Sequence, residues 1–130
     1  MKSPSNKKKS HPNDLVIKNG IQGNGVFASR KINKGTLVFI MHGKIINAPT
    51  QTSVQIGEHS HIEDPLAGLI NHSCQPSVSV NRLEHAFMSL RDILPDEEIT
   101  FDYTQNEDHM AVPFKCECCG QKIRGRKVEA

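Results

Sequence analysis

Two stretches decide the fold of this sequence: Asn71-His72-Ser73-Cys74 and Glu97-Glu98-Ile99-Thr100-Phe101-Asp102-Tyr103. The second is a β-prone run that follows a polar turn at residues 94–98, and it predicts a strand over residues 99–103. The first follows a short apolar segment at residues 66–70, which predicts one helical turn. On either side lie short β-prone runs separated by glycine, proline and asparagine turns, and no segment keeps helical periodicity over three turns. The predicted strands are 15–17, 26–28, 36–41, 44–46, 54–56, 77–82, 86–90 and 99–103, so the predicted class is mainly β.

Charge is spread unevenly along the 130 residues. Residues 1–11 carry four lysines and no acid, residues 12–114 carry seven bases and twelve acids, and residues 115–130 carry five bases and two acids. The net charges are therefore +4, −5 and +3. An acidic body could attract a cationic peptide, whereas the plainer interpretation is that the basic ends only keep the chain in solution. The lysine-rich, proline-broken residues 1–12 predict a disordered basic tail, and the remaining length suits one domain with a modest core.

The four cysteines, Cys74, Cys116, Cys118 and Cys119, do not form the pattern of a secreted disulfide framework. Three of them lie within four positions, and adjacent cysteines pair poorly with each other. Metal binding and reduced thiols are the two interpretations that remain open. The sequence has no apolar run of ~20 residues and no apolar start of the kind found in signal peptides. We therefore expect an intracellular protein, cytoplasmic if bacterial, that does not bind a membrane.

Four motifs follow one another in the chain: Gly23-Asn24-Gly25, the tetrapeptide that ends at Cys74, the strand that ends at Tyr103, and Cys116-x-Cys118. In this order they resemble the SET-domain protein-lysine methyltransferases, over roughly residues 15–125. The resemblance implies the SET β-fold of several small sheets with a C-terminal pseudoknot, in which the segment ending at Tyr103 overlaps the chain near the tetrapeptide. It divides the chain into the basic tail at 1–12, a SET domain at 13–112 and a post-SET-like cysteine tail at 113–130. The short length is similar to that of minimal SET proteins of bacteria and large viruses.

The resemblance also implies an S-adenosyl-L-methionine-dependent protein-lysine N-methyltransferase. Glycines let the backbone approach a ligand closely, and in the family the glycine motif grips the methionine part of the cofactor; an isolated motif of this kind would be a hairpin turn. An asparagine amide donates two and accepts two hydrogen bonds, so Asn71 would bind both the cofactor amine and the pseudoknot backbone. His72 would contact the adenine edge and Phe114 would flank its ring, the alternatives being a structural histidine and a core phenylalanine. The implied cofactor-binding residues are Gly23, Asn24, Gly25, Asn71, His72, Tyr103 and Phe114.

Tyr103 is the only tyrosine in the chain, and the resemblance makes it the catalytic residue. Methyl transfer needs a neutral amine, whereas a free lysine has a pKa of about 10.4. An apolar channel beside a sulfonium cation lowers that pKa, and the Tyr103 hydroxyl would orient the methyl group. Phe101 stands where family members select the product, and phenylalanine there predicts transfer of more than one methyl group.

The sequence departs from the family pattern in two places. No second tyrosine follows the run at residues 37–46, and the segment between residues 46 and 71 is short. In the cysteine tail, Cys74, Cys116 and Cys118 match family zinc ligands, but Ile123 stands at the fourth position. Cys119 could replace that ligand, so zinc bound by Cys74, Cys116, Cys118 and Cys119 is one hypothesis. Thiols that cap the cofactor pocket without metal are the other.

The expected partner is a lysine-containing protein substrate, a histone or another basic protein. A homodimer is compatible with the short length, and we expect no direct binding of nucleic acid. Two other functions stay open. The first is a catalytically weak SET-fold module that binds peptide or cofactor, and the second is a zinc-stabilised interaction protein without cofactor.

Overall fold

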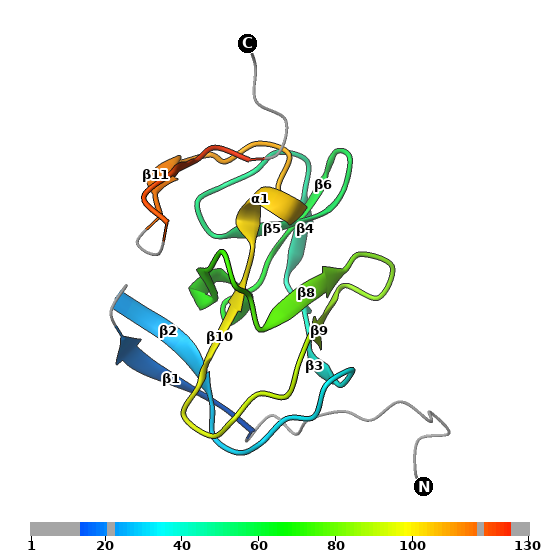
Figure 1. The fold of residues 1–130 in the computed structure, drawn as a ribbon. Coiled ribbons are helices and arrows are strands. Elements are labelled where there is room, and N and C mark those ends of the chain that lie inside the picture. Colours follow the sequence, from blue (N-terminus) through cyan, green and yellow to red (C-terminus); the bar gives the residue numbers. More distant parts are fainter. Residues whose placement is uncertain (1–13, 21–22, 117–118, 126–130) are drawn as a thin grey trace, which may run out of the picture.

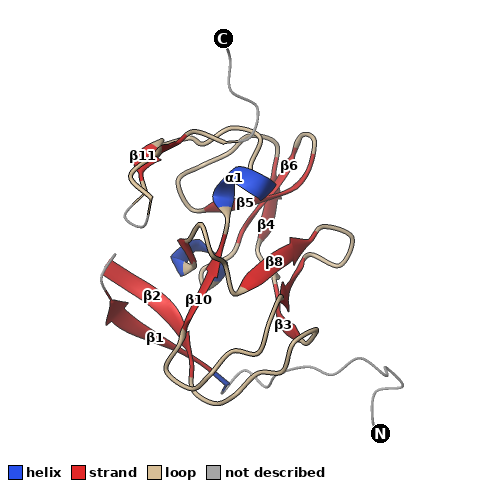
Figure 2. Cartoon of the chain, viewed as in Figure 1, coloured by secondary structure: helices blue, strands red, loops and turns tan. Residues whose placement is uncertain are grey.

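A computed structural model describes residues 14–20, 23–116 and 119–125, and short strands dominate it (Figures 1 and 2). The elements in chain order are β1(Leu15–Gly20), β2(Gly23–Ala28), β3(Leu37–Ile40), β4(Lys44–Ile46), β5(Ser53–Gly57), β6(Ser60–Glu63), η2(Ala67–Leu69), β7(Asn71–His72), β8(Val78–Asn81), β9(Ala86–Ser89), β10(Glu98–Phe101), α1(Tyr103–Asn106), β11(Phe114–Lys115) and β12(Lys122–Ile123).

The sheet that positions the site has the strand order β1-β2-β10-β7. β1 and β2 form an antiparallel hairpin, and β10 pairs antiparallel with β2 through Ile99 and Val26. On its other side β10 pairs in parallel with β7, which places Thr100 opposite Asn71 and Phe101 opposite His72. Two motifs nearly thirty residues apart therefore lie side by side, and this is the adjacency that the predicted pseudoknot requires.

Three smaller sheets surround this one. Their strand orders are β3-β9-β8, β4-β6-β5 and β11-β12. In Figure 1 the β11 ribbon lies at the upper left, above the β1–β2 hairpin. β12 pairs with β11, matching Ile123 with Phe114, and the Phe114 ring lies 5.8 Å from that of Tyr103, two residues after the end of β10.

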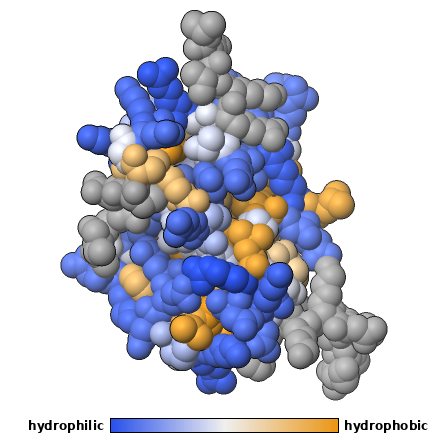
Figure 3. All heavy atoms as spheres, in the orientation of Figure 1, coloured by the Kyte–Doolittle hydropathy of each residue, from blue (hydrophilic) through white to orange (hydrophobic). Residues whose placement is uncertain are grey.

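One apolar cluster fills the space between the sheets. Val26, Ile70, Phe87 and Ile99 are each at most 1% exposed, and a fully buried side chain of this kind contributes about 1.5–3 kcal/mol. The Phe87 and Phe101 rings continue the cluster toward the site, with centroids 5.3 Å apart. The face in Figure 3 is mostly hydrophilic with separate apolar patches, as is ordinary for a protein surface.

The predicted mainly β class and several small sheets are confirmed, with local differences. The first strand, predicted over residues 15–17, continues to Gly20, because Gly20 pairs with Gly23. The strand predicted over 99–103 ends at Phe101, and Tyr103 instead begins α1. Asp102 is the reason: its carboxylate accepts a 3.0 Å hydrogen bond from the Thr104 N–H and so caps the helix.

Some predictions fall outside the described residues. The tail predicted at residues 1–12 lies there, as does Cys118 in the predicted cysteine tail. In the described part of the chain, no helix is long and apolar enough to cross a membrane.

Candidate active site

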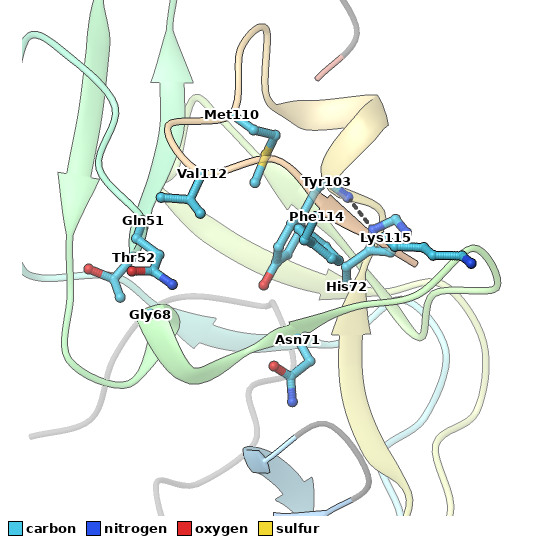
Figure 4. A pocket seen from close by; sticks show the side chains of 10 residues that line it. All are labelled: Gln51, Thr52, Gly68, Asn71, His72, Tyr103, Met110, Val112, Phe114 and Lys115. Atoms are coloured by element: carbon cyan, nitrogen blue, oxygen red, sulfur yellow. Dashed lines mark hydrogen bonds between the residues drawn. The ribbon is translucent and has the colours of Figure 1, made fainter. Parts of the chain in front are cut away.

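A cavity of about 440 Å³ opens where β7, the start of α1 and the segment before β11 meet (Figure 4). Its lining residues are Gln51, Thr52, Gly68, Asn71, His72, Tyr103, Met110, Val112, Phe114 and Lys115. Four predicted site residues, Asn71, His72, Tyr103 and Phe114, therefore share one pocket.

Tyr103 places its hydroxyl in this pocket. The hydroxyl donates a 2.6 Å hydrogen bond to the Ile70 carbonyl, which fixes the ring and leaves the oxygen lone pairs for other partners. Burial raises the pKa of Tyr103 well above its ordinary value, and the nearby Glu107 and Glu98 carboxylates raise it further. The side chain is thus a neutral phenol at physiological pH. It can orient a ligand by hydrogen bonds, but it does not serve as a phenolate base.

Aromatic rings surround Tyr103 on three sides. Its centroid lies 5.2 Å from that of His72, 5.8 Å from that of Phe114 and 4.7 Å from that of Phe101. Phe101 is only 3% exposed and lies in the wall of a narrower pocket that adjoins the first. That second pocket also contacts Glu107, Ile70 and Met110. Tyr103 lines both pockets and so lies where the wide pocket meets the narrow one.

His72 connects the two motifs through its side chain. Nδ1 accepts a 3.0 Å hydrogen bond from the Tyr103 backbone N–H, so a neutral ring carries its proton on Nε2. Burial lowers the pKa of His72, and Asp102 opposes that change only in part. Nε2 faces the Cys74 sulfur at 3.8 Å. The side chain is therefore a neutral link between Cys74 and Tyr103.

The glycine motif lies directly against Asn71. The Asn71 amide nitrogen donates to the Asn24 carbonyl at 3.2 Å and to the Glu98 carboxylate at 2.8 Å. A Cβ at Gly25 would overlap the Glu98 carboxylate, which would then have to move away from Asn71. Gly23 has a φ of 88°, in the left-handed region that glycine adopts without strain. The backbone conformation thus favours glycine at position 23, and glycine at position 25 lets the Glu98 carboxylate reach Asn71.

Three cysteines converge beside His72. Cys74 Sγ lies 3.5 Å from Cys116 Sγ and 3.1 Å from Cys119 Sγ. Tetrahedral zinc with Zn–S bonds of ~2.3 Å holds its sulfurs about 3.8 Å apart, so these donors fit zinc with small shifts. Cys118 lies outside the described residues. Ile123, which stands at the family's fourth ligand position, is a buried residue of β12.

His72 has an imidazole nitrogen close enough to join such a cluster, since its nitrogen and the Cys74 and Cys116 sulfurs lie within 4.8 Å of one another. Its hydrogen bonding argues against ligation. A zinc-bound Nε2 would need the proton on Nδ1, yet Nδ1 accepts the Tyr103 N–H. We therefore assign His72 as an N–H donor to the Cys74 sulfur, outside the ligand set.

Sequence reasoning missed several residues of the site. Gln51 and Thr52 line the wide pocket from the loop before β5, in a segment that contains no tyrosine. Glu98 and Glu107 carry carboxylates next to predicted residues. Glu98 could have been predicted as a site residue, because it lies within the motif at residues 97–103. Gln51 and Thr52 could not have been predicted from a local pattern, because long-range contacts of the fold bring their loop to the pocket.

Comparison with known proteins gives one consistent picture. The family model described as "SET domain" matches residues 23–104. A Candida glabrata protein named "Histone-lysine N-methyltransferase, H3 lysine-36 specific" is 29% identical over 136 residues, which cover 85% of this chain and 19% of that protein. Histone-lysine N-methyltransferase 2B of Homo sapiens is 27% identical over 133 residues, covering 84% of this chain and 5% of that protein. The chain thus spans about a fifth or less of these relatives.

Solved structures agree at the level of the fold. A crystal structure of KRYPTONITE in complex with mCHG DNA and SAH superposes with a TM-score of 0.68 at 21% identity, over 84% of this chain and 28% of that chain. A second KRYPTONITE structure, with mCHH DNA, an H3(1-15) peptide and SAH, gives a TM-score of 0.63 at 21% identity, over 80% and 27% of the two chains.

Proposed function

The chain belongs to the SET domain family, and from this premise we propose that it is an S-adenosyl-L-methionine-dependent protein-lysine N-methyltransferase. The observation that carries the proposal is the convergence of Asn71, His72, Tyr103 and Phe114 on one pocket. Relatives named histone-lysine N-methyltransferases support the same activity.

The cofactor fits the residues at the wide pocket. Asn71 offers its amide and Phe114 an aromatic face in this pocket, and the glycine motif lies beside Asn71, whose amide donates to the Asn24 carbonyl. When bound, S-adenosyl-L-methionine supplies an activated methyl group on a sulfonium. The SAH in the two solved neighbours supports this choice of cofactor.

Tyr103 would align the reacting groups. Its hydroxyl is held by Ile70, and its high pKa keeps the proton in place. A neutral hydroxyl where the two pockets meet can accept weak C–H contacts from a methyl group and so fix its direction. The lysine must enter as a free amine, and burial beside a cation lowers its pKa from about 10.4 toward that state. The chain's contribution is therefore alignment and exclusion of water.

Phe101 would set the number of methyl groups transferred. Its ring lines the narrow pocket without a hydroxyl, so a water there would lack one hydrogen-bond partner. A methyl group already on the lysine could displace such a water. We therefore propose multiple methylation.

The proposed substrate is a basic, histone-like peptide. Relatives are named for histone lysines, and one solved neighbour holds an H3 peptide. The net charge of −5 over residues 12–114 favours a cationic partner.

We also propose zinc, held by Cys74, Cys116 and Cys119 with Cys118 as the candidate fourth ligand. The sulfur–sulfur distances of 3.1 and 3.5 Å support it. Bound there, zinc would tie the 113–130 tail to the tetrapeptide. Such reduced thiols suit an intracellular compartment.

A catalytically weak binding module is the second candidate, because the sequence lacks the second tyrosine of the family and the loop before β5 presents Gln51 and Thr52 to the pocket instead. Calorimetry with S-adenosyl-L-methionine, followed by transfer of a labelled methyl group to an H3 peptide, separates the two. Binding and transfer by the native protein, with transfer abolished in Tyr103→Phe, is the result expected of the enzyme. Binding without transfer to any basic protein would favour the module.

A further inference from the structure

The Asn71 side-chain amide has two hydrogen-bond acceptors next to its nitrogen. Its nitrogen lies 3.2 Å from the Asn24 carbonyl oxygen and 2.8 Å from Glu98 Oε2. A carbonyl and a carboxylate cannot donate a hydrogen bond, so the amide NH₂ must face them. The orientation of the amide follows from its neighbours and does not depend on a choice between nitrogen and oxygen.

The Asn71 carbonyl oxygen is then directed the other way. In Figure 4 the nitrogen points toward the blue ribbon of the β1–β2 hairpin and the oxygen points away from it. Within residues 14–20, 23–116 and 119–125, no donor reaches this oxygen. Asn71 lines the wide pocket, so the oxygen is an acceptor available to a ligand that carries N–H groups.

Glu98 reaches Asn71 only because residue 25 is glycine. The Glu98 carboxylate occupies the space that a Cβ on Gly25 would fill. Glu98 stands at the start of β10, opposite Phe27 of β2, so sheet pairing holds its backbone. Gly25 therefore has a second role here, to admit a carboxylate behind the Asn71 amide.

We propose that Glu98 is a positioning residue that holds the Asn71 carbonyl oxygen toward the ammonium group of the cofactor's amino-acid part. This rests on the proposed function. Without the Glu98 acceptor, the amide loses one of the two bonds that fix it and can turn its NH₂ toward the pocket, where it would repel an ammonium. The negative charge behind the amide acts in the same direction, because it favours a cation in front of it.

Two ligands distinguish this role from a general structural one. S-adenosyl-L-homocysteine carries the ammonium, whereas 5′-methylthioadenosine keeps the adenosine and sulfur but lacks the whole amino-acid part. A residue that acts through Asn71 on the ammonium should change binding of the first and leave that of the second unchanged. A residue that only supports the fold should change both.

The test is calorimetric titration of both ligands into the full chain and three variants. Glu98→Ala removes the acceptor, and we expect about tenfold weaker binding of S-adenosyl-L-homocysteine with unchanged binding of 5′-methylthioadenosine. Glu98→Gln keeps an oxygen that accepts from Asn71, so it should retain affinity within about threefold. Glu97→Gln is the matched control, since the Glu97 carboxylate accepts from the Leu94 N–H in an exposed turn.

Glu98→Asp guards against an alanine variant that fails to fold. It keeps the charge but withdraws the carboxylate by one methylene, and it should weaken only S-adenosyl-L-homocysteine, by several-fold. Equal affinity for S-adenosyl-L-homocysteine in the native and all Glu98 variants would overturn the positioning role, as would a parallel loss of both ligands. A native protein that binds neither ligand would instead refute the proposed function, and the positioning role with it.

Discussion

The Nδ1 atom of His72 accepts a 3.0 Å hydrogen bond from the backbone N–H of Tyr103. His72, from the stretch that ends at Cys74, therefore holds the backbone of Tyr103. Tyr103 is the first residue of α1 and carries the hydroxyl of the site. On its far side the same ring faces the Cys74 sulfur at 3.8 Å. The position of Tyr103 thus depends on a buried ring that joins it to the cysteine cluster.

His72→Ala should lower both stability and activity. The change removes a buried ring, leaves the Tyr103 N–H without its acceptor and opens a cavity, which together cost about 2–4 kcal/mol. Urea unfolding and transfer of a labelled methyl group measure the two effects. His59→Ala is the control, because the His59 side chain is 84% exposed. A His72→Ala variant as stable as this control would contradict the linking role.

Tyr103→Phe should remove most activity and leave the fold intact. The variant keeps the ring among its aromatic neighbours but loses the hydroxyl that donates to Ile70. The loss of one neutral hydrogen bond costs about 1 kcal/mol of stability, whereas a misaligned methyl group costs about 100-fold in rate. A thermal melt and a transfer assay give both numbers. Native rates in the variant would defeat the assignment of Tyr103 as the catalytic residue.

The sequence predicted best where local residue types decide the structure. Branched apolar runs such as residues 36–41 marked strands, and the α1 start could also have been predicted, because Asp102 is a good helix cap. β7 could not be, since its two residues become a strand only by pairing with β10. β6 was missed because its polar residues, His61 and Glu63, hide a strand that tertiary pairing stabilises.

The site divides in the same way. Asn71, Tyr103 and Phe114 were predicted from motifs, and the fold brings them together. Gln51 and Met110 reach the pocket from loops whose course depends on long-range contacts, so no local pattern announces them. Glu98 shows a third case. The sequence shows a carboxylate at position 98, but it does not predict the contact with Asn71, because that contact requires the absence of a Cβ at Gly25.

Glu107→Gln should stabilise the protein increasingly as pH rises. Burial raises the pKa of Glu107 above 4.5, although hydrogen bonds from Gln55 and Asn106 oppose the shift. A raised native pKa means that the native state binds the proton more tightly than the unfolded state does. The stability that Glu107 contributes is therefore greatest below its unfolded pKa and is lost as pH rises through the native pKa.

Glutamine at position 107 removes this dependence without losing contacts. Both donors bind the same carboxylate oxygen, Oε2, and the amide oxygen of glutamine can accept both. Urea unfolding of the two proteins between about pH 4 and about pH 8 measures the difference. The difference in the free energy of unfolding between the two proteins should grow with pH. A difference that stays constant, or that favours the native protein at high pH, would show that burial of the charged Glu107 carboxylate does not destabilise the protein.

Removal of metal should loosen the C-terminal tail. If zinc joins Cys74 to Cys116 and Cys119, chelation removes the bonds that hold β11 and β12 beside the tetrapeptide, and the melting temperature should fall. Elemental analysis of the purified protein should find close to one equivalent of zinc. Cys119→Ser and Cys118→Ser, compared side by side, identify the further ligand. Less than about a tenth of an equivalent in metal-replete native protein would refute the site and leave the cluster as thiols.

Phe101→Tyr should shift the product toward monomethyl-lysine. The Phe101 ring lies 4.7 Å from that of Tyr103 and lines the narrow pocket beside Glu107. After one transfer, the amine must rotate so that its lone pair faces the sulfonium again, and the first methyl group needs space. A tyrosine hydroxyl could hold an ordered water there, and displacing a well-bound water without replacing its hydrogen bonds costs affinity. The first transfer should change little, because Tyr103 keeps its place.

Mass spectrometry of the substrate after long incubation at saturating cofactor distinguishes the products. The native protein should yield di- or trimethyl-lysine, and the Phe101→Tyr variant should stop at one methyl group. Phe39→Tyr is the matched control, since Phe39 packs against Phe87 with ring centroids 6.4 Å apart and lies outside both pockets. Because the control adds the same hydroxyl elsewhere, an equal shift in both variants would mean that the added oxygen acts through stability. If the native protein itself yields only monomethyl-lysine, the absence of a hydroxyl at position 101 does not determine the product.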